Sequence, residues 1–323
     1  MTTFEDIISA SKRIEPYINH TPVHTSRTLN EIVEANVYIK CENFQRMGAF
    51  KFRGACNALL LLDDESKKKG IVTHSSGNHA QAVALAGKLL GLKTVIVMPN
   101  NAPQVKVDAT KGYGAEVVFS EPDVVSRERA CNKLIQDCGY TLIHPYDNET
   151  VIQGAGTASF ELVEEIGQLD LLIVPVGGGG LISGSSIYAK GSEKVVRVLG
   201  AEPENADDAH QSFHTKILVK SHTPDTIADG LRTVLSERTF GYIRKNVDDI
   251  ITVSETEIVE AMKFLWERMK IIVEPSGATP LAVVFKLAKQ NKIVRGSKIG
   301  LILSGGNVDL SSFFDQYKHL FSK

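Results

Sequence analysis

The sequence predicts an α/β protein whose open, twisted sheets contain parallel-type strands flanked by helices. Two observations predict this class. Short apolar runs of strand length alternate with amphipathic runs of helix length, a pattern typical of parallel sheets with helical crossovers. The chain has 323 residues, 43% of them hydrophobic and 23% charged, which is an ordinary globular composition and enough chain for two domains.

The expected strands are short runs rich in aliphatic and β-branched residues, at 36–41, 70–74, 94–98, 116–119, 170–176, 196–201, 250–253 and 298–303. The expected helices are amphipathic, at 80–90, 105–111, 124–137, 156–166, 182–190, 255–269 and 280–289. The strand–helix units in the middle form a compact run. We therefore expect a small domain at residues 70–147 and a large domain at residues 1–69 and 148–323.

Charge and apolar patterning argue against several classes of partner. The net charge of −2 gives no reason to expect binding to nucleic acid or to an anionic membrane surface. Apolar runs such as 171–176 are far too short to cross a bilayer, and the start, MTTFEDIISASKRIEPY, lacks a signal-peptide core. Cys41, Cys56, Cys131 and Cys138 have no CxxC spacing. Free thiols in a reducing compartment explain them, so we expect a cytoplasmic protein.

The stretch GAFKFRG, residues 48–54, places Lys51 between Phe50 and Phe52. A lysine in an apolar pocket tends to lose its proton, and a neutral amine can form an imine with an aldehyde. The alternative is that Lys51 and Arg53 lie on the solvated face of a strand or helix. The stretch alone leaves both interpretations open.

The turn SSGNHAQ, residues 75–81, directly follows a predicted strand. Gly77 permits a tight turn. Ser75, Ser76 and Asn78, together with the free N–H groups of the next helix, form a donor-rich cup suited to a carboxylate. Serine and asparagine are also common helix caps, so a purely structural role is the alternative.

Two further turns are placed to hold a cofactor. In VPVGGGGLISG, residues 174–184, four consecutive glycines follow a buried strand, and a backbone without β-carbons can wrap a phosphate. The sequence is neither a nucleotide P-loop nor a spaced dinucleotide fingerprint; flexible loop glycines are the alternative. In LILSGGNVD, residues 301–309, the Ser304 hydroxyl lies at a strand end, although a simple turn would also explain it. A phosphate cradle, a buried lysine, a carboxylate cup and a hydroxyl fit pyridoxal 5′-phosphate.

The chain resembles the fold-type II pyridoxal-phosphate enzymes, which have a tryptophan synthase β-like fold, in the branch of serine racemases and serine/threonine dehydratases. The resemblance covers nearly the whole chain. It is carried, in family order, by motifs that include KCENFQRMGAFKFRGA, SSGNHAQAVA, VPVGGGGLISG, AEPENADDAHQS, ERMKIIVEPSG and SGGNVD. The resemblance implies a large cofactor-binding domain and a small mobile domain.

The resemblance also implies roles for individual residues. Lys51 would hold the cofactor as an imine and move the substrate proton on the si face, and Ser76 would act on the re face. The other implied cofactor residues are Phe50 beside the ring, Asn78 at the ring hydroxyl, Gly177, Gly178, Gly179, Gly180 and Leu181 at the phosphate, and Ser304 at the ring nitrogen. The substrate cup would consist of Ser75, Ser76, Gly77, Asn78 and His79.

Acid–base groups on both faces imply a serine racemase that also eliminates water from serine to give pyruvate and ammonia. The alternative is a dehydratase of L-serine, L-threonine or 3-hydroxyaspartate with little racemisation, because some relatives with serine at position 76 are known chiefly as hydroxyaspartate dehydratases. A β-replacement synthase is a third alternative, and SSGNHAQ counts against it. A non-catalytic pyridoxal carrier is a fourth, and it would lack imine exchange.

A metal site and a homodimer follow from the same resemblance. Glu202, the Ala206 carbonyl and Asp208 match the racemases' site for Mg²⁺, Mn²⁺ or Ca²⁺, although residues alone would also fit an acidic surface loop. Gln81 and Tyr113 match parts of the ATP site of animal racemases. Tyr146 stands where those enzymes usually have asparagine, which counts against activation by ATP.

Overall fold

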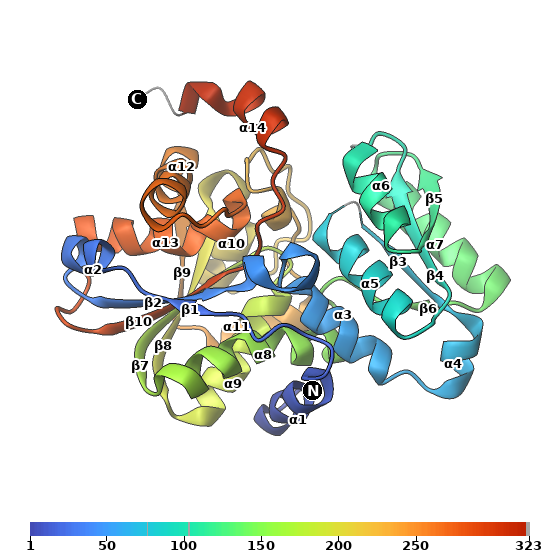
Figure 1. Cartoon of the computed structure of the whole chain (residues 1–323), viewed down its shortest axis with the longest axis horizontal. Helices are drawn as coiled ribbons and strands as arrows, with labels where there is room; N and C mark the ends of the chain where they lie inside the picture. The colour runs from blue at the N-terminus through green and yellow to red at the C-terminus, as the bar shows by residue number, and fades with distance from the viewer. Residues whose placement is uncertain (76, 103, 321–323) are drawn as a thin grey trace.

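The computed structural model describes residues 1–75, 77–102 and 104–320, and it contains two sheets, each flanked by helices (Figure 1). This confirms the predicted α/β class. The two sheets lie side by side, the six-stranded sheet in one half of the molecule and the four-stranded sheet in the other. Within the described ranges, no helix has both the length and the apolar character needed to cross a bilayer.

The six-stranded sheet has the order β1-β2-β10-β7-β8-β9. All of its pairs are parallel except β1 with β2, which are antiparallel. Its strands are β1 (Val23–His24), β2 (Asn36–Cys41), β7 (Leu169–Pro175), β8 (Val195–Pro203), β9 (Asp249–Val253) and β10 (Lys298–Leu303). Helices cover both faces, so the central strands are buried on both sides, as is usual for parallel sheets.

Two hydrophobic cores lie on the two faces of this sheet. One packs α2 (Arg27–Val33), α12 (Glu255–Phe264) and α13 (Pro275–Lys289) against the strands. The other packs helices on the opposite face, namely α1 (Phe4–Ile14), α8 (Glu149–Ile166), α9 (Gly180–Ser192) and α11 (Glu237–Asn246). The remaining helices beside this sheet are α10 (Asp208–Thr215) and α14 (Leu310–Tyr317).

The four-stranded sheet is parallel throughout, with the order β5-β4-β3-β6. Its strands are β3 (Ile71–His74), β4 (Thr94–Pro99), β5 (Glu116–Ser120) and β6 (Thr141–Leu142), and the surrounding helices are α3 (Lys51–Leu60), α4 (Asp64–Lys69), α5 (Asn78–Leu89), α6 (Gln104–Gly112) and α7 (Val124–Cys138). The strands fall within residues 70–147. The exact domain boundaries and the mobility of this part stay predictions.

Two helices begin earlier than their glycine and proline content suggests. α8 begins at Glu149 and runs through Gly154 and Gly156, where an added β-carbon would approach the Arg53 carbonyl oxygen to 2.4 Å and Gly184 to 2.9 Å. These glycines allow close helix packing and do not break the helix. α13 begins at Pro275, before the predicted residue 280, and contains Pro280. The Ser276 carbonyl, which the missing N–H of Pro280 cannot reach, accepts from the Thr279 hydroxyl at 3.0 Å.

A buried network of charges joins three elements beneath the start of α3. Arg53 is fully buried and pairs with Glu42 at 2.7 Å and with Glu161 at 2.6 Å. Lys40, also fully buried, pairs with Glu161 at 2.7 Å. Two cations thus face two carboxylates, and hydrogen bonds from Thr21 to Glu42 and from Arg53 to Thr157 satisfy further atoms. The network ties α3 to β2 and α8.

We expect the Arg53→Met substitution to lower the free energy of unfolding by about 3–5 kcal/mol, because it leaves two buried carboxylates with one cation. Urea denaturation followed by circular dichroism measures the change. The control is Lys194→Gln, which breaks the half-exposed Lys194–Glu164 pair and should cost below about 1 kcal/mol. Equal losses in the two variants would contradict a special role for the buried network.

Candidate active site

Lys51 is the first residue of α3, and its side chain points toward the segment before α8. The Lys51 Nζ donates to the Pro145 carbonyl oxygen at 2.9 Å and lies 5.2 Å from the centre of the Phe50 ring. Burial lowers the pKa of Lys51 to about 8, and the nearby Glu274 carboxylate partly opposes this shift. A substantial fraction of the amine is therefore neutral near physiological pH, which is the form that attacks an aldehyde.

Ser304 lies directly beside the start of α3, although it is far from Lys51 in the sequence. It follows β10, and its carbonyl oxygen accepts from the Phe50 N–H at 2.9 Å. A bridge between Ala49 and Gly305 extends the same contact. The parallel sheet therefore brings Ser304 to the residue that precedes Lys51.

The four glycines follow β7 and lead into α9, as a phosphate cradle requires. Gly179 has φ +83° and precedes the first residue of α9. A β-carbon on Gly178 would lie 2.4 Å from the Tyr146 ring. Because Tyr146 follows Pro145, the acceptor of the Lys51 amine, the glycine loop and Lys51 contact neighbouring residues of one segment. A free helix N-terminus of this kind suits an anion such as phosphate.

The predicted substrate cup lies at the start of α5. Gly77 precedes α5, Asn78 is its first residue, and the Ser75 hydroxyl accepts from the Gly77 N–H at 3.2 Å. His79 is buried, its Nε2 contacts the Ile143 carbonyl oxygen at 2.9 Å, and its Nδ1 has no hydrogen-bond partner among the described residues. Burial lowers the pKa of His79 well below the usual range, so the ring is neutral. Ser76 lies outside the described residues.

Glu274 is a site residue that the sequence reasoning missed. The Asn78 amide nitrogen donates to both Glu274 carboxylate oxygens, at 2.9 and 3.1 Å, and the Asn307 N–H donates to one of them at 3.2 Å. The Asn78 amide oxygen accepts from Asn307, whose amide nitrogen also donates to the Met47 carbonyl. These linked hydrogen bonds fix the orientation of the Asn78 amide group. Burial raises the pKa of Glu274, and the three N–H donors oppose that shift.

A signal for Glu274 was present in the sequence. The motif ERMKIIVEPSG places an acidic residue directly before a proline and a helix, and such a residue lies at the helix N-terminus. An acidic residue there is also a common surface feature, so the pattern alone does not indicate that it faces Lys51. The Tyr146 and Arg53 contacts described above had no comparable signal.

The predicted metal residues lie between the end of β8, which contains Glu202, and the start of α10, whose first residue is Asp208. Glu202 and Asp208 are buried, and the Glu202 carboxylate accepts from the N–H groups of Ala209 and His210 at 3.0 and 2.7 Å. Burial, together with the charge of Asp208, raises the pKa of Glu202 well above its usual range, and burial raises the pKa of Asp208 to about 6. The buried Asp208 Oδ2 has no hydrogen-bond partner among the described residues.

These donors fit a hard cation, because two close buried carboxylates with an unpartnered oxygen gain from a positive charge between them. Within the described residues no cluster of three or more His, Cys, Asp or Glu side chains could hold a metal ion. A cation here would therefore take its further ligands from carbonyl oxygens or water.

In this parallel α/β fold, a partly neutral lysine and a glycine loop suited to phosphate contact the same segment. This combination is typical of enzymes that bind an aldehyde cofactor through lysine. Comparisons with known proteins agree. Residues 14–305 match the model of the family "Pyridoxal-phosphate dependent enzyme", and the chain belongs to this family. This confirms the resemblance seen in the sequence.

Three relatives show the branch. The chain is 51% identical to the L-threo-3-hydroxyaspartate ammonia-lyase of Saccharomyces cerevisiae, over 96% of this chain and 95% of the relative. It is 50% identical to the serine racemase of Dictyostelium discoideum, over 96% of both chains. The structure of maize serine racemase matches with a TM-score of 0.93 and 45% identity, over 99% of this chain and 98% of that one. The relatives thus include racemases and ammonia-lyases at similar identity.

We expect Glu274→Gln to lower the pKa of Lys51, because the Glu274 charge favours the protonated amine. In cofactor-free protein, modification of Lys51 by an amine reagent should have a pH midpoint shifted downward, with the rate near pH 8 raised up to about twofold, because burial raises the pKa of Glu274 to about 8 and its charge is only partly present below that pH. Peptide mass spectrometry measures this rate.

The matched control is Glu257→Gln, which removes a carboxylate from the capping box of α12 instead of from the site. An unchanged midpoint in Glu274→Gln, or an equal shift in the control, would show that Glu274 does not act on the Lys51 amine.

Proposed function

We propose that the protein is a pyridoxal-phosphate-dependent serine racemase that also eliminates water from serine to give pyruvate and ammonia. The observation that carries this proposal is the part-buried Lys51 amine, whose pKa is lowered to about 8 and which donates to the segment that contacts the glycine loop. When bound, the cofactor supplies an electron sink that acidifies the hydrogen on the substrate α-carbon.

The residues of this chain divide the remaining work. The Lys51 amine attaches the cofactor and, once released from it, accepts or donates the α-proton on one face. Ser76 acts on the opposite face, as the sequence implies, and two proton carriers on opposite faces permit inversion. Phe50 and Ser304 would border the cofactor ring, and Gly177 to Gly180 and Leu181 would hold its phosphate. Glu274 accepts from the Asn78 amide nitrogen and so fixes the orientation of that amide.

The substrate carboxylate binds at the start of α5. The free N–H groups of the first turn and the side chains of Ser75, Ser76 and Asn78 supply donors, and the positive end of the helix favours an anion. The His79 ring next to Asn78 is buried and neutral, and it contacts the Ile143 carbonyl oxygen. The same cup accepts any α-amino acid, so it does not distinguish serine from a larger substrate.

The second candidate function is 3-hydroxyaspartate ammonia-lyase, and a specific observation favours it. A β-carboxylate needs a cationic partner, and Arg127, in the first turn of α7, has a buried Nε without a hydrogen-bond partner among the described residues. Burial lowers the pKa of His74, and the charge of Arg127 adds to this shift. The His74 ring contacts His144, which in turn contacts Tyr146 beside the glycine loop. Relatives named for this activity match the chain closely.

Comparison of wild type with Ser76→Ala tests the proposal. With L-serine, wild type should form D-serine, and the substitution should reduce this at least about 100-fold while pyruvate formation persists, because only the second face loses its proton carrier. Chiral chromatography and a coupled pyruvate assay measure the two products. Equal loss of both would contradict the two-face assignment. Ammonia release from 3-hydroxyaspartate without formation of D-serine would favour the second candidate.

We also propose that Glu202, Asp208 and the Ala206 carbonyl bind a divalent cation such as Mg²⁺, Mn²⁺ or Ca²⁺. The unpartnered Asp208 Oδ2 and the raised pKa values of both carboxyls support this assignment. The cation would neutralise two carboxylates that the fold otherwise buries close together at a cost in free energy, so its role is structural. The homodimer and the cytoplasmic location stay predictions from the sequence, and Tyr146 still counts against activation by ATP.

Millimolar MgCl₂ should raise the melting temperature of wild type by several degrees, and Asp208→Asn should abolish the rise. Without cation, the raised pKa of Asp208 makes stability fall as pH rises from about 4 through about 6, by up to about 3 kcal/mol, since only the protonated carboxyl is buried cheaply. Asp208→Asn should flatten this fall. The control is Asp207→Asn, whose carboxylate accepts from Gln211 instead. A Mg²⁺ response that persists in Asp208→Asn would place the ion elsewhere.

A further inference from the structure

The segment of residues 144–149, here called the hinge segment, connects the four-stranded sheet to α8 of the six-stranded sheet. It supplies two contacts of the active site. The Pro145 carbonyl accepts from the Lys51 amine at 2.9 Å, and the Tyr146 ring packs against Gly178 of the glycine loop. The position of this segment therefore sets where the amine and the loop meet.

The hinge segment is held from one side by α11. Arg238, in the first turn of α11, donates from Nη1 to Asp147 at 2.7 Å, and its Nε forms an ion pair with Glu149 at 3.1 Å. One guanidinium thus spans two carboxylates of the segment. The Ser236 hydroxyl donates to Asp147 at 3.0 Å, and the Tyr242 hydroxyl donates to Glu149 at 2.8 Å.

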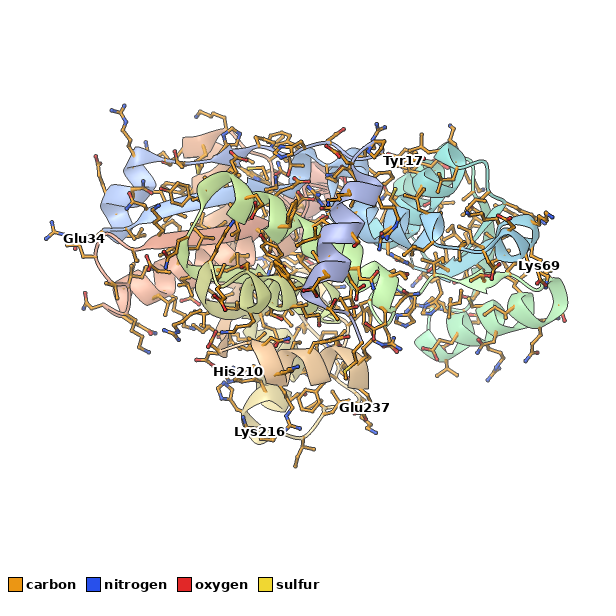
Figure 2. All side chains as sticks on the ribbon, turned by 90° about the horizontal axis from the view of Figure 1, so that it is seen from below. Tyr17, Glu34, Lys69, His210, Lys216 and Glu237 are labelled. Carbon is orange, nitrogen blue, oxygen red and sulfur yellow. The ribbon has the colours of Figure 1, made fainter. Side chains whose placement is uncertain are left out.

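The same turn of α11 also contacts the glycine loop. A β-carbon on Gly179 would lie 2.7 Å from the Leu235 side chain and 2.8 Å from Thr239. In Figure 2, Glu237 marks the first residue of α11, and the helix lies in the half of the molecule that contains the six-stranded sheet, far from Lys69. The start of α11 therefore contacts both the glycine loop and the hinge segment.

We propose that Arg238 is a positioning residue, which fixes the hinge segment against the glycine loop and thereby holds the Pro145 carbonyl and Tyr146 where Lys51 and the cofactor phosphate need them. This inference rests on the proposed function for its effect on the cofactor. A planar guanidinium can engage two carboxylates at once, whereas a lysine ammonium lacks the fork that this geometry uses.

Two backbone amides report the order of the hinge segment directly. The Tyr146 and Asp147 N–H groups donate to the His144 Nδ1, at 3.3 and 2.8 Å. Hydrogen exchange at these amides measures how often the segment opens, independently of any reaction. A residue that served only global stability would not change exchange at these two positions selectively.

The experiment compares wild type, Arg238→Gln and Arg238→Lys with Lys190→Gln as matched control. The control breaks Lys190–Asp248, an ion pair of similar exposure that does not contact the hinge segment. In Arg238→Gln we expect exchange at Tyr146 and Asp147 to be about 3- to 10-fold faster and the dissociation constant for pyridoxal 5′-phosphate to rise about 3- to 10-fold. In Arg238→Lys, the exchange rates and the dissociation constant should lie between those of wild type and Arg238→Gln. In the control, both should equal the wild-type values.

Salt supplies an independent arm. At about 1 M NaCl, exposed ion pairs are screened, so wild type should show the faster exchange while Arg238→Gln changes little. If Arg238→Gln does not fold, Asp147→Asn removes one partner of the fork, keeps the side-chain size and should give the same direction of change.

Unchanged exchange at both amides in a folded variant, or the same change in Lys190→Gln, would overturn the proposal. So would faster exchange without any loss of cofactor affinity. Absence of the imine absorbance near about 410–420 nm in wild type with the cofactor would instead count against the proposed function, and the exchange result would still decide whether Arg238 holds the segment.

Discussion

The position of Lys51 depends on Arg53, two residues later, which buried ion pairs anchor beneath the start of α3. Arg53 carries the one cation of α3 that is fully buried, and Glu42 and Glu161 hold it from two other elements. A helix that buries a charge has few alternative positions, since any shift that separates the ions leaves a charge uncompensated. The network is therefore poor evidence of high stability and good evidence of a specified geometry. The network fixes the position of the first turn of α3, and Lys51 is the first residue of that turn.

The other side of the site depends on residues that the chain brings together from distant positions. Ser304 reaches Phe50 because β10 pairs with β2, and Asn78 reaches Glu274 across the two sheets. Lys106 of α6 and Asp229 form an ion pair between these halves, at 2.9 Å. The candidate cofactor site thus lies between the two sheets. Lys51, Asn78, Glu274 and Ser304 each come from the end of a strand or the start of a helix, where ligands collect in parallel α/β proteins.

The sequence predicted the fold class and the turns that carry chemistry, because glycine runs and strand–helix alternation are local signals. It placed α8 and α13 too late, since Gly154 and Pro280 look like breakers until their neighbours are known. It could not find the Arg53 network, Glu274 facing Lys51, or the Arg238 fork, because each depends on residues about ten to more than two hundred positions apart. Pairing of that kind is set by topology and leaves no periodicity in the sequence.

Two buried acidic sites show how the same physical problem is solved in different ways. Both oxygens of Glu274 are engaged by amide donors, so its charge or its proton is accommodated by fixed protein dipoles. Glu202 has two backbone donors, but Asp208 beside it keeps one oxygen without any described partner, and the repulsion between the two carboxyls raises the pKa of Glu202. A proton on either group would relieve the repulsion and still leave an unpaired buried oxygen. A divalent cation would relieve both defects at once, and this is why we propose the second site, and not the first, as a metal site.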